Sequence, residues 1–207
     1  MYAHVALVAG LAIVGLASGR VQCSLIARYV SAHPSPLAAG LVTAVILAAL
    51  GVRVHPPLVL AAACALALCA VPLAFIDVAV QRLPDPLTAA AYTGTVVFLL
   101  LAAAVSGHWG AAGRAVLGGL ALAAVYLGLL FISPSGMGLG DVKLAMSLGT
   151  LLAWRSWQLL VLGGFAGFLL AAVYSIVLLA TRRATRKQHI PFGPFMIAGT
   201  LLTLLLT

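Results

Sequence analysis

The chain of 207 residues contains three acidic side chains, all of them aspartates: Asp77, Asp85 and Asp141. Each lies at the end of a long apolar run. A carboxylate at membrane depth is costly unless it is paired, protonated or open to water, so its presence points to function. Two carboxylates held close together share one proton. One can then act as general base toward a water and the other as acid toward a carbonyl oxygen, which is aspartic-protease chemistry.

Asp77 and Asp141 are the pair that the sequence favours for this chemistry. Asp77 follows the apolar run Leu58–Ile76, and an acid at a helix C-terminus opposes the helix dipole, so its position needs another reason. Asp141 follows a glycine-rich run, residues 136–140, and taken alone it reads equally well as a helix N-cap. The two runs cross the membrane in opposite directions. Both carboxylates are therefore predicted to lie at the same depth on the same side.

Asp85 and Lys143 are interpreted differently. Asp85 lies between Pro84 and Pro86 and is expected to cap the next helix, with Pro86 at the first helical position. Lys143 stands two residues after Asp141, about 200° around a helix, and is expected to extend to the lipid headgroups and not to contact the pair.

The composition excludes a water-soluble enzyme and a disordered linker. Hydrophobic residues make up 64% of the chain and charged residues 7%, too few to cover a soluble body. The formal net charge is +8, but the basic residues fall between apolar runs and not on one polar face. We therefore expect contact with membrane lipids and no nucleic-acid partner.

Apolar runs of roughly 17–25 residues mark the helices that must position the aspartates. We predict an all-α, polytopic transmembrane bundle of about eight spans, forming one integral-membrane domain over residues 1–207. The first basic residue, Arg20, comes after the first apolar stretch, so this stretch is expected to remain as a span and not to be a cleaved signal. The predicted spans are Val5 to about Ile26, Leu37–Val52, Leu58–Ile76, Leu87–Val105, Ala111–Ile132, Val142–Ala153, Trp157–Ala180 and Phe192–Leu206.

The distribution of lysine and arginine predicts the orientation. With the N-terminus outside, four loops face the cytoplasm: Arg20–Pro36, Asp77–Pro86, Ser133–Asp141 and Thr181–Pro191. The cytoplasmic side then carries eight of the eleven basic residues, as the positive-inside rule requires. The sequence thus predicts a multi-pass protein of the cytoplasmic membrane whose aspartate site faces the cytoplasm.

No metal or cofactor is expected. Cys23, Cys64 and Cys69 form no CxxC pair. The histidines show no ligand spacing, and His189 is either a proton relay or an ordinary interfacial residue.

Three further segments follow one another along the chain, each at a predicted cytoplasmic span end. They are Phe75-Ile76-Asp77 with Leu83-Pro84-Asp85, then Gly136-Met137-Gly138-Leu139-Gly140-Asp141-Val142-Lys143-Leu144, then Ile190-Pro191-Phe192-Gly193-Pro194-Phe195. In this order they resemble the type IV prepilin peptidases, which belong to the wider GxGD group of membrane aspartyl proteases, and the similarity covers about Leu58–Leu206.

This resemblance implies cleavage of the short leader of a pilin-like precursor at the cytoplasmic membrane face. It implies that Asp77 and Asp141 are catalytic and that Asp85 is not. Gly138, Gly140, Pro84 and Asp85 are then expected to shape the site. Larger members carry, between the first two spans, a cytoplasmic domain with paired cysteines that accompanies N-methylation. Here that interval is a short loop up to Pro36 near a single Cys23, so we expect no methyl transfer.

Two other functions fit some of these features. A proton-coupled transporter also uses membrane aspartates, but it usually carries them near the bilayer midplane and shows repeat symmetry, and no repeat is visible here. A non-catalytic subunit of a pilus or secretion assembly would tolerate the loss of either aspartate, and the intact pair argues against it.

Overall fold

The computed structural model describes residues 2–31, 34–133, 137–181 and 190–207, and within these ranges it has eight α-helices and no strand. This confirms the all-α prediction. The basic cluster of Arg182, Arg183, Arg186 and Lys187 lies outside the described residues, as do His33, Gly136 and His189. The helices are α1 Tyr2–Ala27, α2 Pro36–Arg53, α3 Pro57–Val80, α4 Asp85–Ser106, α5 Trp109–Ile132, α6 Leu139–Arg155, α7 Trp157–Ala180 and α8 Gly193–Leu206.

Six helices of the described chain, α1 to α5 and α7, are long and apolar enough to cross a membrane. The protein is therefore built as a multi-pass membrane protein. The other two are shorter: α6 has 17 residues and α8 has 14. At a rise of about 1.5 Å per residue, they reach about 25 Å and 21 Å, less than the ~30 Å hydrocarbon core. An end of a short helix inside the protein needs hydrogen-bond partners from the protein itself.

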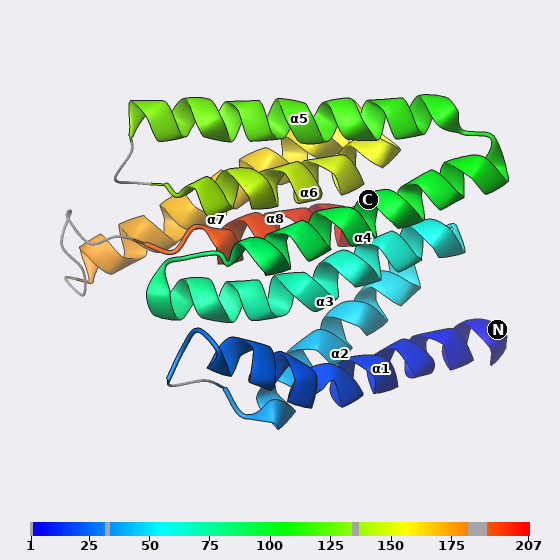
Figure 1. Cartoon of the computed structure of the whole chain (residues 1–207), viewed down its shortest axis with the longest axis horizontal. Helices are drawn as coiled ribbons and strands as arrows, with labels where there is room; N and C mark the ends of the chain where they lie inside the picture. Colours follow the sequence, from blue (N-terminus) through cyan, green and yellow to red (C-terminus); the bar gives the residue numbers. More distant parts are fainter. Residues whose placement is uncertain (1, 32–33, 134–136, 182–189) are drawn as a thin grey trace.

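Successive helices alternate in direction, so the odd-numbered helices end where the even-numbered ones begin (Figure 1). These four helix ends and four helix starts lie at one end of the bundle, opposite the N-terminus (Figure 1). They flank the four connections that are predicted to face the cytoplasm.

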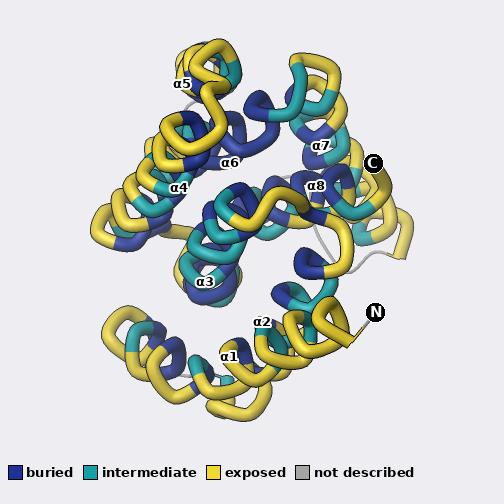
Figure 2. The backbone as a smooth tube through the Cα atoms, turned by 90° about the vertical axis from the view of Figure 1, so that its right-hand side faces the viewer, coloured by how far each residue is buried: buried dark blue, intermediate teal, exposed yellow. Residues whose placement is uncertain are grey.

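Helix α3 occupies the centre of the bundle (Figure 2). Of its most apolar stretch 67% is buried, against 11% for α1, which exposes most of its apolar side chains. Helices α1, α2, α4, α6 and α8 all contact α3, whereas α5 and α7 lie farther out. Helix α3, which carries Asp77, and the short helix α6, which carries Asp141, thus face mainly protein.

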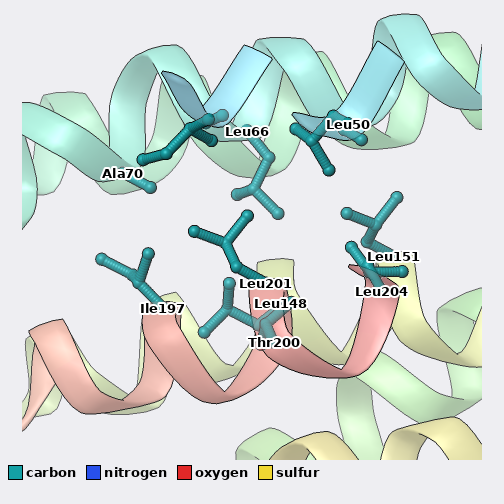
Figure 3. A pocket seen from close by; sticks show the side chains of 12 residues that line it. Leu50, Leu66, Ala70, Leu148, Leu151, Ile197, Thr200, Leu201 and Leu204 are labelled. Carbon is teal, nitrogen blue, oxygen red and sulfur yellow. The ribbon is translucent and has the colours of Figure 1, made fainter. Parts of the chain in front are cut away.

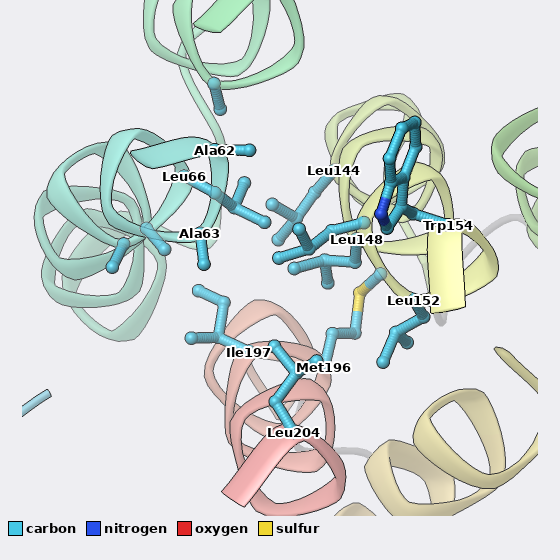
Figure 4. Packing of buried hydrophobic residues seen from close by; sticks show 14 of the residues in the cluster. Ala62, Ala63, Leu66, Leu144, Leu148, Leu152, Trp154, Met196, Ile197 and Leu204 are labelled. Atoms are coloured by element: carbon cyan, nitrogen blue, oxygen red, sulfur yellow. The ribbon is translucent and has the colours of Figure 1, made fainter. Parts of the chain in front are cut away.

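The core around α3 consists of aliphatic side chains from α3, α6 and α8 that point toward one another (Figure 4). Leu66, Leu148 and Ile197 meet there and are each at most 7% exposed. A small cavity of about 20 Å³ remains between α2, α3, α6 and α8 (Figure 3). It has room for about one water, but its lining is almost entirely aliphatic and offers few polar groups to bind that water. This packing fixes the relative positions of the two helices that carry Asp77 and Asp141.

Glycines bring the helix pairs α5–α6 and α7–α8 into close contact. A Cβ on Gly149 would lie 3.0 Å from the Gly118 carbonyl oxygen, and one on Gly199 would lie 2.8 Å from the Gly167 Cα. Small residues at such crossings allow membrane helices to gain van der Waals contact. The α5–α6 contact becomes important for the site.

Arg114 of α5 caps the C-terminal end of the short helix α6. Its guanidinium donates hydrogen bonds to the carbonyl oxygens of Ala153 and Arg155, at 2.7 and 3.1 Å, and to that of Trp154. These carbonyls have no partner within their own helix. The cationic side chain also opposes the negative end of the helix dipole, so α6 can end within the protein.

Two predicted boundaries were wrong by about a turn. Helix α3 continues past Ile76 to Val80, so Asp77 lies within its last turn and not after it. Helix α6 begins at Leu139 and not at Val142, because Asp141 stabilises its first turn from within. Pro72, which lies inside the predicted third span, is also inside α3 and does not end it.

Candidate active site

Asp77 is buried at the C-terminal turn of α3, where its side chain is 4% exposed. The helix is closed by Gln81 in the left-handed region, with φ 53°, and the Gln81 N–H donates to the Asp77 carbonyl. The Asp77 Oδ2 accepts a hydrogen bond of 2.9 Å from the N–H of Gly193, the first residue of α8. The carboxylate thus faces the positive end of a second helix. This contact explains how an acid can be stable at the C-terminus of α3, where the dipole of its own helix disfavours it.

Asp141 lies on the first turn of α6 and is 7% exposed. Its Oδ2 accepts a hydrogen bond of 2.9 Å from the N–H of Gly138 at the N-cap position. Its Oδ1 is buried and has no hydrogen-bond partner within the part of the chain that the structure describes. A buried carboxylate oxygen without a partner is unusual and marks a position where a ligand, a water or a reacting group can bind. Asp141 therefore both caps its helix and keeps one oxygen for other contacts.

The structure brings these two carboxylates into one site. Helices α3 and α6 are in contact, and the charge of Asp141 acts on Asp77. Two buried negative charges repel each other strongly in a low dielectric, so one proton shared between them stabilises the pair. Each carboxylate also accepts one backbone N–H at the start of a short helix. The short helices α6 and α8 thus both begin at the aspartate site.

Leu83 lies between the two segments that hold the aspartates. It is 8% exposed and belongs to the connection from α3 to α4. A Cβ added to Gly140 would come within 2.7 Å of the Leu83 Cβ, and one added to Gly193 within 3.5 Å of its Cδ2 and 2.9 Å of the Asp77 Oδ2. Both positions therefore need glycine for close approach.

The residues predicted to shape the site differ in how tightly their surroundings constrain them. A Cβ on Gly138 would lie 3.6 Å from the nearest atom, an ordinary contact, and the φ of −102° suits any residue. Pro84 is the N-cap residue of α4, with an extended ψ of 129° that directs the chain from Leu83 into the helix. Sterically, Gly140 is thus the constrained glycine of the motif and Gly138 is not.

The expectation that Asp85 caps α4 was wrong. The helix begins at Asp85 itself, Pro86 is therefore its second residue, and no side chain caps this end. The Asp85 carboxylate instead forms an ion pair of 2.6 Å with the Lys143 ammonium, with side-chain exposures of 72% and 46%. Lys143 was expected to reach the lipid headgroups. It pairs with Asp85 because α4 and α6 are neighbours, a contact that sequence spacing does not show.

Two residues of the site were given no role from the sequence. Gly193 was noted only within its motif, and its N–H donor to Asp77 becomes visible when α8 docks on α3. Tyr126 lies in the second half of the apolar helix α5 and is 1% exposed, close enough to Asp141 for the two side chains to interact electrostatically. A tyrosine hydroxyl in such a span was a signal that could have been used.

An open groove of about 700 Å³ lies beside the site, along the end of α3 and the connection to α4. It is lined by Ile76, the residue before Asp77, and by Leu83. Its polar wall includes Arg82 and Asp85. Among the described residues, no group of three or more histidine, cysteine or acidic side chains is placed to hold a metal ion.

Comparison with known proteins identifies the family. The model of the type IV leader peptidase family matches residues 60–176, more than half of the chain. The chain belongs to this family. The leader peptidase match includes Asp77, the Leu83-Pro84-Asp85 connection, Tyr126 and the Gly138–Asp141 motif.

Curated members of the leader peptidase family are similar over part of their length. The chain is 37% identical over 135 residues to the prepilin leader peptidase/N-methyltransferase of Aeromonas salmonicida (strain A449), covering 62% of this chain and 44% of the relative. It is 36% identical over 165 residues to that of Aeromonas hydrophila, covering 77% and 54%. With the protein of the same name from Stutzerimonas stutzeri the values are 39% over 132 residues, 61% and 43%. The chain thus spans about half the length of these relatives. No solved structure matches the chain.

Proposed function

We propose that this chain is an aspartic endopeptidase that removes the N-terminal leader of type IV pilin-like precursors, with Asp77 and Asp141 as its catalytic pair. Membership of the leader peptidase family supports the substrate class. The observation that carries the mechanism is the burial of two interacting carboxylates, each with one oxygen on a backbone N–H and the other available. The peptidase is proposed to occupy the whole chain as one domain.

The proposed reaction uses a water between the two carboxylates. The ionised carboxylate takes a proton from this water while the water oxygen bonds to the scissile carbonyl carbon. The protonated carboxyl gives its proton to the carbonyl oxygen. The tetrahedral diol then collapses. The C–N bond breaks, the first carboxyl returns its proton to the leaving nitrogen, and one diol hydroxyl gives its proton to the second carboxylate. The pair ends with one proton, as it began.

The position of the pair fits a cut near one membrane face. Both aspartates lie where α6 and α8 begin, at the end of the bundle that carries the four predicted cytoplasmic connections (Figure 1). A precursor whose apolar segment lies in the bilayer would present the chain just before that segment at this depth. We propose that this face is the cytoplasmic one. A transporter would be expected to place its acids nearer the midplane.

Leader cleavage of a pilin-like precursor in membranes tests this function. Asp77→Asn and Asp141→Asn keep size and hydrogen bonding but remove the carboxylate that must alternate between base and acid. Each should eliminate nearly all turnover, and the double variant should lose no more, because the two groups act as one unit. Asp85→Asn, at matched expression, is the comparison variant. Substantial cleavage by either Asp77→Asn or Asp141→Asn would reject the proposed pair.

A further inference from the structure

The wall of the aspartate site contains a buried tyrosine that the mechanism above does not use. Tyr126 of α5 is 1% exposed. Its ring centroid lies 5.2 Å from that of Phe168 and 5.9 Å from that of Phe192. Phe192 immediately precedes Gly193, whose N–H holds Asp77. The ring of Tyr126 is thus fixed by aromatic packing next to the segment that binds one of the two carboxylates.

The packing of α5 against α6 directs Tyr126 toward the other carboxylate. The two helices run in opposite directions and approach closely at their glycines: a Cβ on Gly149 would meet the Leu122 Cβ at 2.9 Å. Tyr126 is one turn beyond Leu122, toward the start of α6, where Asp141 lies. The charge of Asp141 accordingly reaches Tyr126. A phenolic hydroxyl and a buried, unpartnered carboxylate oxygen therefore lie in the same site.

We propose that Tyr126 is a positioning residue: in the working enzyme its hydroxyl donates a hydrogen bond to Asp141 Oδ1, directly or through one water, and so assigns Asp141 the role of general base. This inference rests on the proposed function. Asp141 then has a donor on each oxygen, Gly138 N–H on Oδ2 and Tyr126 on Oδ1, whereas the described part of the chain offers Asp77 one donor, Gly193 N–H. Donors stabilise the ionised form of a carboxylate. The shared proton therefore stays on Asp77, which acts as the acid.

The titratable side chains on the other helices that pack against α6 leave this asymmetry in place. Helix α3 presents Asp77, and Asp85 of α4 is paired with Lys143 of α6 itself. On α7, Tyr174 packs against Phe195. The described part of α8 carries no titratable side chain. Tyr126 is the donor on α5 that faces Asp141.

The test is Tyr126→Phe, which removes one oxygen and keeps the ring contacts. We expect kcat for leader cleavage to fall about 10- to 100-fold, since hydrogen bonds to charged groups are among the stronger ones, with little change in KM. The acidic limb of the activity profile should move toward neutral pH, because Asp141 is protonated more easily without this donor. Tyr174→Phe, which also keeps a ring contact, is the matched control and should match the unaltered protein in kcat and pH profile.

The proposal is overturned if Tyr126→Phe keeps its kcat, if its loss lies in KM alone, or if the acidic limb stays in place while the thermal inactivation midpoint drops, since the hydroxyl would then serve packing only. These outcomes differ from a failure of the proposed function. Activity in Asp77→Asn or Asp141→Asn would reject the pair itself. Inactive aspartate variants together with an unaltered Tyr126→Phe would reject only the role of Tyr126.

Discussion

Replacing each glycine of the Gly138-Leu139-Gly140-Asp141 motif by alanine should give very different results. At Gly140 the new Cβ would lie 2.7 Å from the Leu83 Cβ, 3.3 Å from its carbonyl oxygen and 3.4 Å from its Cα. Ordinary contacts start near 3.4 Å, so Leu83 or α6 must shift by somewhat under 1 Å. Two of these three atoms belong to the backbone and the third, Cβ, is bonded directly to it, and Pro84 stiffens the chain that follows. The clash cannot be relieved by a side-chain rotation.

The cost of this clash can be set against intrinsic helix preference. Overpacking of this kind costs about 1–3 kcal/mol, whereas Gly→Ala in a helix gains up to about 1 kcal/mol. At Gly138, the N-cap position, alanine loses up to about 1 kcal/mol as a cap but meets no atom closer than 3.6 Å. Helix preference alone thus predicts that Gly138→Ala is the more damaging change, and the structure predicts the reverse order.

Activity should separate the two variants further than stability does. A Cβ on Gly193 would also lie 3.5 Å from the Leu83 Cδ2, and the Gly193 N–H donates to Asp77. A shift of Leu83 or α6 caused by a side chain at position 140 therefore disturbs the positions of both aspartates. We expect Gly140→Ala to lose most leader cleavage and to inactivate at a lower temperature. Gly138→Ala keeps the N–H that binds Asp141 and should retain most activity. The assays are cleavage of a precursor in membranes and the thermal inactivation midpoint in detergent. If Gly140→Ala is as active as Gly138→Ala, the steric reasoning is wrong.

Three further predictions concern the ion pair, the topology and the chemistry of the product. Asp85→Asn should keep leader cleavage and change stability by less than about 1 kcal/mol, because its pair with Lys143 is largely exposed; complete loss of activity would move the catalytic assignment to Asp85. In a chain whose three native cysteines have been replaced, Ser106→Cys and Ser133→Cys should react with a membrane-impermeant thiol reagent from opposite sides of the membrane, with Ser106→Cys on the outside. Labelling of both from the same side would contradict the eight-span topology. Purified protein given a processed pilin and a methyl donor should leave the new N-terminus unmodified, and a product heavier by one methyl group would contradict this.

The sequence determined the architecture because membrane helices are specified locally. Runs of apolar residues about 20 long have to be helical in lipid, and proline, glycine and charge mark their ends, so the eight helices could be predicted without any knowledge of contacts. The scarcity of acidic residues likewise allowed the catalytic pair to be predicted from the sequence. With three aspartates in the whole chain, Asp77 and Asp141 could be selected from their positions at the ends of opposed spans.

The contacts between helices were decided only by the tertiary structure, because they join residues far apart in the chain. Gly193 meets Asp77 across 116 positions and Lys143 meets Asp85 across 58, and no periodicity or cap signal reports such distances. The same holds for Leu83, which separates the constrained Gly140 from the tolerant Gly138 although both are glycines of one motif. Tyr126 looked like one more apolar position of its span. Close packing at the glycines of α5 and α6 sets the register that places Tyr126 near enough to Asp141 for the two side chains to interact electrostatically.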